Sequence, residues 1–115
     1  MTVVIYHNPA CSTSRKALAA IREAGYEPEI VEYLKTPPDA RKLRELIAAI
    51  GIAPRDLVRK KGALYGELGL DDPDLGDDAL IAAMEAHPVL IERPIVVTPK
   101  GTVLARPLDR LADIL

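Results

Sequence analysis

Cysteine is almost absent from this chain, whose 115 residues include only Cys11. A single cysteine permits no internal disulfide, which agrees with a reducing compartment. It also means that a redox cycle through Cys11 needs a thiol from another molecule to complete it.

Long apolar runs and a strong net charge are missing as well. No run approaches the roughly 18 residues needed to cross a bilayer, and the N-terminus lacks the basic start and apolar block of a signal peptide. We therefore expect a cytoplasmic protein that does not contact membranes. A net charge of -2 and a pI near 5.7 give no general attraction to nucleic acid, so any anion site must be local.

Clustered metal ligands and a second domain are also lacking. His87 has no second His, no Cys and no group of carboxylates around it, so we expect neither a metal site nor a bound cofactor. The length suits one domain over residues 1–115. No spare apolar face is evident, which predicts a monomer.

Cys11 lies in a polar turn between a β-branched run, residues 2–6, and a helical pattern, residues 16–21. A helix N-terminus can lower the pKa of a thiol from roughly 8.5 to between about 3.5 and 7.5. His7 and Arg15, four residues away on either side, could add positive charge near the sulfur. The turn therefore predicts a reactive thiolate.

The residues around the cysteine fit such a turn. Asn8 and Pro9 form the bend, and Ser12, Thr13 or Ser14 can cap the helix. Free cysteine is often a small buried apolar residue, which is the alternative interpretation. The polar neighbours of Cys11 favour the reactive one.

The rest of the chain predicts an α/β fold with a β-α-β start, a helical insertion, a β-hairpin and a C-terminal helix. A second strand is expected over 28–34, and a helix after Asp39 has an apolar face at Leu43, Leu46, Ile47 and Ile50. A further helix is expected over 77–86. The expected hairpin joins strands 95–98 and 102–105, and Pro107 can begin the last helix, which runs to the end of the chain.

Several motifs together resemble the glutaredoxin-coupled arsenate reductase family over essentially the whole chain. They are His7-Asn8-Pro9-x-Cys11-x-x-Ser14-Arg15, Tyr33-Leu34-x-Thr36-Pro37-Pro38, Leu57-Val58-Arg59-Lys60, Glu67-Leu68-Gly69-Leu70, Arg93-Pro94-Ile95-Val96-Val97-Thr98-Pro99 and Arg106-Pro107. The resemblance implies a thioredoxin-like fold with an inserted helical region. It also implies that arsenate is the substrate, that glutathione is the co-substrate and that glutaredoxin is the partner.

The same resemblance assigns roles to individual residues. It implies that Cys11 is the nucleophile and that Arg59, Arg93 and Arg106 bind the oxyanion. It makes Pro94 a cis proline that faces the cysteine. His7 is implied to lower the pKa of Cys11, and Ser14 to hydrogen-bond the thiolate. Planar guanidinium groups suit these roles because their paired donors match two oxygens of a tetrahedral anion.

Two other functions use a similar scaffold. Thiol-stress regulators that bind RNA polymerase share the fold, but those that sense oxidation use a Cys-x-x-Cys pair, and Ser14 occupies the second position here. Monothiol glutaredoxin-like proteins share the Cys-x-x-Ser spacing, but Ser12 and Thr13 lack their glycine-rich character. A phosphatase-like Cys-x5-Arg loop does not fit, because only three residues separate Cys11 from Arg15.

Overall fold

The computed structural model describes residues 1–115, which form two compact units. The first unit comprises residues 1–36 and 93–115, and the second comprises residues 37–92. The elements in chain order are β1 (Val4–His7), α1 (Ser12–Glu23), β2 (Glu29–Glu32), α2 (Ala40–Ile50), α3 (Pro54–Leu57), α4 (Leu64–Glu67), α5 (Asp77–Ala86), η1 (Pro88–Leu90), β3 (Ile95–Thr98), β4 (Gly101–Leu104) and η2 (Leu108–Asp113), where η marks a 3-10 helix. The single domain expected over 1–115 stays a prediction.

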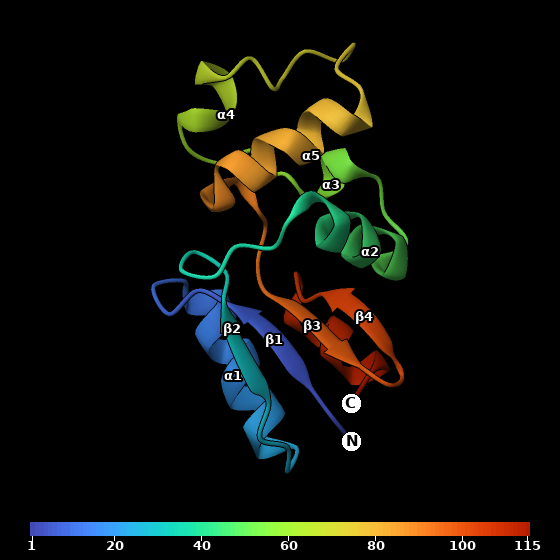
Figure 1. The fold of residues 1–115 in the computed structure, drawn as a ribbon. Helices are drawn as coiled ribbons and strands as arrows, with labels where there is room; N and C mark the ends of the chain where they lie inside the picture. Colours follow the sequence, from blue (N-terminus) through green and yellow to red (C-terminus); the bar gives the residue numbers. More distant parts are fainter. The chain divides into compact units, whose positions relative to one another are not determined.

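The first unit is built on a four-stranded sheet in the order β2-β1-β3-β4 (Figure 1). β1 pairs with β2 in parallel and with β3 antiparallel, and β3 and β4 form the antiparallel hairpin. A parallel pair needs a crossover connection, which α1 provides. The predicted β-α-β start and hairpin are therefore confirmed, and this is the thioredoxin-like arrangement that the resemblance implies.

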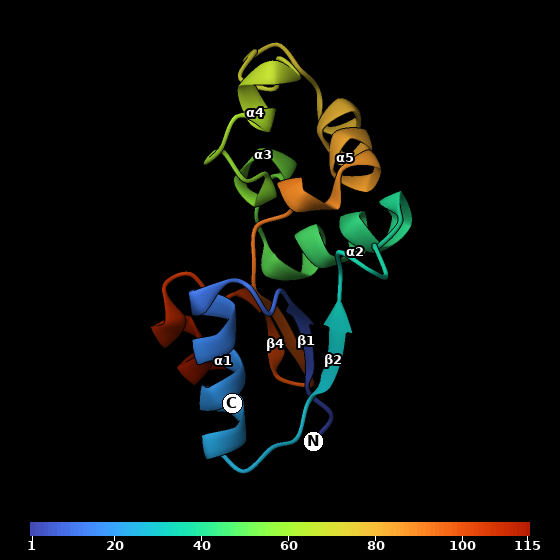
Figure 2. The same ribbon diagram turned by 90° about the vertical axis from the view of Figure 1, so that its left-hand side faces the viewer.

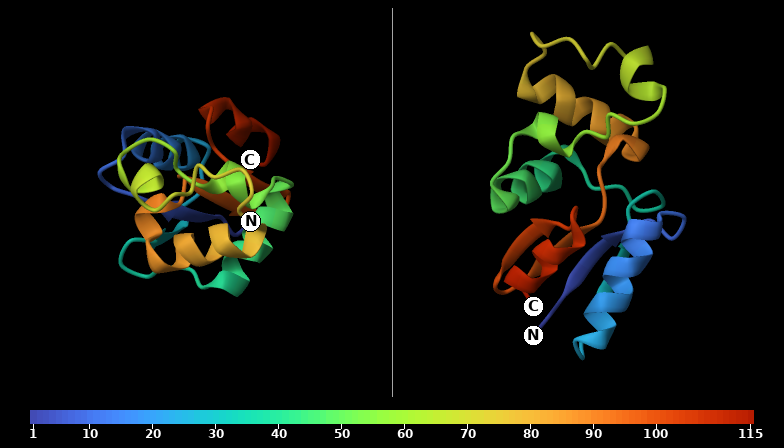
Figure 3. Two further views of the ribbon diagram at one scale, coloured as in Figure 1. Left: turned by 90° about the horizontal axis from the view of Figure 1, so that it is seen from above. Right: turned by 180° about the vertical axis from the view of Figure 1, so that it is seen from behind.

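One face of this sheet is covered by α1 and η2, which the right-hand view of Figure 3 shows in front of the strands. A hydrophobic core lies between this face and the helices. Val3, just before β1, and Ile5 of β1 pack in it against Ala17 and Ile21 of α1. Because side chains alternate along a strand, His7 points to the same face as Val3 and Ile5. This places an imidazole at the end of the apolar core, next to the start of α1.

The second unit is the predicted helical insertion. α2 begins after Asp39, whose Oδ1 accepts a hydrogen bond from the Lys42 N–H at 2.8 Å, and it ends at Gly51 in the left-handed conformation. The expected apolar face is buried at Leu43, Leu46 and Ile47, whereas Ile50 is half-buried. α2, α3 and α5 contact one another within this unit (Figure 2).

Two predicted elements differ from the structure. β2 ends at Glu32 because the carbonyl of Glu32 accepts hydrogen bonds from the N–H groups of Lys35 and Thr36, which turns the chain out of the sheet. The segment after Pro107 is the 3-10 helix η2 rather than an α-helix. None of the helices combines the length and the apolar character that a membrane span requires.

Candidate functional site

The turn before α1 is ordered by short-range hydrogen bonds. The Cys11 N–H donates to the Asn8 carbonyl at 3.0 Å, and the Ala10 N–H donates to Asn8 Oδ1 at 3.0 Å. Arg15 Nη1 donates to the Pro9 carbonyl at 2.8 Å. The predicted bend at Asn8 and Pro9 is confirmed, and Arg15 ties the bend to the helix.

Cys11 occupies the N-cap position of α1 in an extended conformation. The prediction that Ser12, Thr13 or Ser14 caps the helix is therefore wrong, since all three lie inside its first turn. At an N-cap, a side chain faces the unpaired N–H groups of the residues two and three positions later, which here are Thr13 and Ser14. The sulfur is positioned where oxygen usually serves as the cap.

The surroundings of the sulfur favour its anion. Burial raises the pKa of Cys11, but the nearby Ser14 N–H, the donors and charge of the Arg93 guanidinium, and the Thr13 N–H lower it to about 7. Cys11 is half-buried and free, not sealed in the core. These surroundings support the low thiol pKa that the turn predicts.

A buried cluster behind the turn links His7, Asn8 and Ser14. Ser14 Oγ lies 2.6 Å from His7 Nδ1 and accepts a hydrogen bond from the Asn8 N–H at 3.1 Å. Ser14 is fully buried, and burial lowers the pKa of His7, against an opposing effect of Glu32. The pKa of His7 is thus held below its usual value, which favours the neutral imidazole in this buried cluster.

This cluster changes the roles expected for three residues. His7 and Arg15 are not among the groups that lower the pKa of Cys11; they order the turn instead. Ser14 acts on the sulfur through its backbone N–H, because its hydroxyl is already bonded to His7 and Asn8. Sequence reasoning also missed the Thr13 N–H, which its position two residues after an N-cap could have indicated.

Arg93 and Arg106 are brought together by the hairpin. Ile95 of β3 pairs with Leu104 of β4, so the two arginines lie just beyond the same end of the ladder. Arg106 Nη1 donates to the Arg93 carbonyl at 3.0 Å. The Arg93–Pro94 and Arg106–Pro107 peptide bonds are both cis. The cis bond expected at Pro94 is therefore present, whereas its position facing the cysteine stays a prediction.

Arg93 is the arginine that reaches Cys11. It is only 9% exposed, and its hydrogen bond to the thiol leaves Nε and Nη1 buried without a partner. Buried guanidinium donors are normally satisfied, because each unpaired one costs about 1–3 kcal/mol. Two unpaired guanidinium donors beside a thiol are suited to pair with the oxygens of an anion.

Arg59 belongs to the second unit. Its Nη1 forms an ion pair with Glu92 Oε1 at 3.1 Å, and its N–H donates to the Leu90 carbonyl. The bridge between Val58 and Ile91 is antiparallel, so Arg59 lies opposite Leu90 and Glu92 lies opposite Leu57. The two long side chains reach each other diagonally on the same face of this bridge. Its role in oxyanion binding stays a prediction.

No group of three or more His, Cys, Asp or Glu side chains could hold a metal ion.

Residues 6–114 match the ArsC family. The chain belongs to the ArsC family. It is 56% identical over 115 residues to an arsenate reductase of Rhizobium meliloti (strain 1021), covering 100% of this chain and 82% of that protein. It is 53% identical over 113 residues to an arsenate reductase of Escherichia coli (strain K12), covering 98% and 80%.

Solved ArsC structures agree with the fold. An arsenate reductase from Vibrio cholerae superposes with a TM-score of 0.96 at 46% sequence identity, covering 100% of this chain and 98% of that one. The family resemblance and the thioredoxin-like fold expected from the motifs are thus confirmed. The arrangement around Cys11 can accordingly be interpreted as that of an ArsC protein.

The pKa of Cys11 predicts how its alkylation rate depends on pH. With a pKa of about 7, half of the thiol is ionised near that pH, whereas an ordinary cysteine with a pKa of about 8.5 is about 3% ionised there. Reaction with iodoacetamide should therefore rise with pH to a plateau, with its midpoint near pH 7. A midpoint at the value of free cysteine, measured in the same buffers on a cysteine peptide, would contradict the geometry described for the sulfur.

Ser14→Ala is expected to lower the free energy of unfolding by about 1–3 kcal/mol, because the buried Asn8 N–H and His7 Nδ1 both lose their partner. Urea denaturation measures the change. Ser12→Ala is the matched control, since Ser12 lies in the same helical turn but is exposed and forms no hydrogen bond. The control should change stability by less than about 0.5 kcal/mol. Equal effects of the two substitutions would show that the Ser14 hydroxyl has no structural role.

Proposed function

We propose that this protein is an arsenate reductase that uses Cys11 as its nucleophile and receives electrons from glutathione through glutaredoxin. The main support is the half-buried Cys11 thiol, with its pKa of about 7, beside two unpaired buried donors of Arg93. An anion with several oxygens satisfies those donors while presenting its central atom to the sulfur. The relatives named arsenate reductases support the choice of arsenate among such anions.

Three arginines are proposed to surround the oxyanion. Arg93 contributes its free donors, and Arg106, linked to the Arg93 carbonyl, contributes a second guanidinium from the adjoining end of the hairpin. Arg59 is included as the third arginine because the family resemblance implies that it binds the oxyanion. Together their charges offset the repulsion between a thiolate and an anion, and they stabilise the charge that develops on the displaced oxygen.

The proposed reaction proceeds in four steps. The Cys11 thiolate attacks arsenic and displaces one oxygen as water, which forms a sulfur–arsenic bond. The thiol of glutathione displaces a second oxygen, so arsenic then has two sulfur ligands. A glutaredoxin thiolate attacks the glutathione sulfur, and the electron pair of the broken sulfur–arsenic bond reduces As(V) to As(III). Water then releases arsenite and regenerates the Cys11 thiol, while glutaredoxin leaves as the mixed disulfide.

The remaining residues have supporting roles in this proposal. Asn8, Arg15 and the pair of His7 and Ser14 hold the turn so that the N–H groups of α1 face the sulfur. Pro94 follows Arg93 and fixes the start of β3. The protein is proposed to act as a monomer in the cytoplasm, where reduced glutathione is available to complete the cycle.

A coupled assay tests the proposal. The native protein is mixed with arsenate, glutathione, glutaredoxin, glutathione reductase and NADPH, and both NADPH oxidation and arsenite formation are measured. We expect turnover that stops when glutathione or glutaredoxin is omitted, or when phosphate, which has the same shape but is not reduced, replaces arsenate. Absence of arsenite would overturn the proposal. Capture of RNA polymerase subunits by the same inactive protein would favour the regulator hypothesis instead.

A further inference from the structure

The second unit contains a cavity whose ligand the proposed function leaves unassigned. Its volume is about 340 Å³, within the range of about 300–1,000 Å³ typical of small-molecule sites. It lies between the loop that precedes α4 and the 3-10 helix η1. Its lining residues are Arg59, Lys61, Gly62, Ala63, Leu64, Val89 and Leu90.

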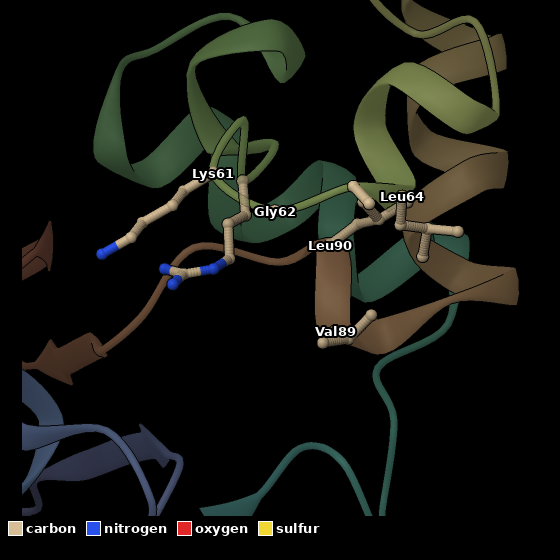
Figure 4. Close-up of a pocket in the computed structure, with 7 residues that line it drawn as sticks. Lys61, Gly62, Leu64, Val89 and Leu90 are labelled. Carbon is tan, nitrogen blue, oxygen red and sulfur yellow. The ribbon is translucent and has the colours of Figure 1, made fainter.

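The cavity has a basic part and an apolar part. In Figure 4 the Lys61 side chain lies on one side of Gly62 and extends away from Leu64 and Val89, which lie on the other side. Val89 is 48% exposed, so its side chain is accessible to a ligand in this cavity. A ligand that fills this space must therefore be anionic at one end and apolar along its other side.

Lys61 is the cation available to such a ligand. Arg59 is paired with Glu92, and each of these side chains is 20% exposed. Lys61 forms neither a hydrogen bond nor an ion pair, and no carboxylate lines the cavity. Gly62, with φ of 102°, permits the turn that follows Lys61. The cavity thus has an excess of positive charge that a carboxylate would complement.

Arsenate alone does not match this cavity. A tetrahedral oxyanion occupies only a small part of about 340 Å³ and has no surface to place on Leu64, Val89 and Leu90. A peptide thiol suits both parts, because its carboxylate can pair with Lys61 while its methylene groups and thiol contact the apolar wall.

We propose that this cavity binds the peptide thiol that supplies electrons, with its carboxylate on Lys61 and its aliphatic part on Leu64 and Val89. The inference rests on the proposed function, in which that thiol is glutathione and Arg59 binds the oxyanion. Arg59, which the proposed function assigns to the oxyanion, lines the same cavity. Lys61 is then a residue that determines specificity for the thiol and does not contact arsenate.

Adjacent lysines provide a matched test. Lys60 and Lys61 are both exposed and unpaired, but only Lys61 lines the cavity. Lys61→Gln is expected to raise the KM for glutathione about tenfold, while the KM for arsenate changes by less than about twofold. Lys60→Gln should leave both values within about twofold of the native enzyme. Equal effects of the two substitutions would overturn the inference, because a general loss of positive charge would then explain them.

A binding measurement separates this inference from the proposed function. S-methylglutathione has a blocked sulfur, so its binding can be followed by NMR without turnover. We expect amide shifts at Gly62, Ala63, Leu64 and Val89 that are lost in Lys61→Gln and retained in Lys60→Gln. Such shifts in a protein that forms no arsenite would sustain the cavity assignment while the proposed function fails. Turnover with no shifts at these residues, or with shifts elsewhere only, would overturn the cavity assignment alone.

Discussion

Arg93→Met is expected to lower kcat/KM for arsenate by about 10²–10³ without lowering the stability of the fold. Methionine has a similar length but no donor and no charge. Its introduction removes the hydrogen bond and the positive charge at Cys11, together with the two unpaired donors proposed to hold the oxyanion. The pKa of Cys11 should accordingly rise above its value of about 7.

The stability of this variant distinguishes a binding residue from a structural one. Arg93 is buried with Nε and Nη1 unsatisfied, a situation that opposes folding in the absence of an anion. Replacing such a group by an apolar side chain of similar size is commonly neutral or stabilising, by up to about 1–4 kcal/mol. We therefore expect the free energy of unfolding of Arg93→Met to equal or exceed that of the native protein.

Urea denaturation, the coupled arsenate assay and the alkylation titration measure the three effects. Arg41→Met is the matched control, because Arg41 is exposed on α2 and forms no hydrogen bond or ion pair. The control should retain native activity and the native titration midpoint. A variant at Arg93 that is destabilised but keeps its kcat/KM would show that this guanidinium serves the fold and not the substrate.

The parts of the fold that were predictable are those with local signals. Asp77 and Asp78 at one end and His87-Pro88 at the other mark α5, whose observed bounds are the predicted ones. β3 also begins and ends as predicted. β4 begins and ends one residue earlier than the predicted strand 102–105. Gly101 pairs with Thr98 in the ladder, so the turn consists of Pro99 and Lys100 alone. Ladder pairing, rather than propensity, decided that boundary.

The candidate site was predictable where the chain brings residues together over short distances. The hairpin places Arg93 beside Arg106, and the start of α1 places N–H groups at Cys11. The bond between His7 and Ser14 depends on which face of β1 meets α1, which a sequence does not specify by itself. The ion pair of Arg59 with Glu92 depends on an isolated bridge between distant segments. These pairings require the assembled fold.

Cys11→Ser is expected to abolish arsenite formation, with a loss on the order of 10³-fold or more. An alcohol is scarcely ionised at neutral pH, so the N–H groups and the guanidinium that favour the thiolate have no anion to stabilise. The fold should persist, because serine is among the preferred N-cap residues and Cys11 occupies the N-cap of α1. Loss of activity with unchanged stability would locate the defect in the chemistry.

The position of the thiol can be tested separately from its presence. Ser12→Cys in the Cys11→Ser background moves the sulfur by one residue, to an exposed site in the same turn of α1. There it no longer occupies the N-cap, and the Ser14 and Thr13 N–H groups do not face it, so its pKa should return toward about 8.5 and activity should stay absent. Arsenite formation by Cys11→Ser alone, with glutathione and glutaredoxin present, would refute the proposed sulfur–arsenic adduct. Recovery in the double variant would show instead that any thiol near the arginines suffices.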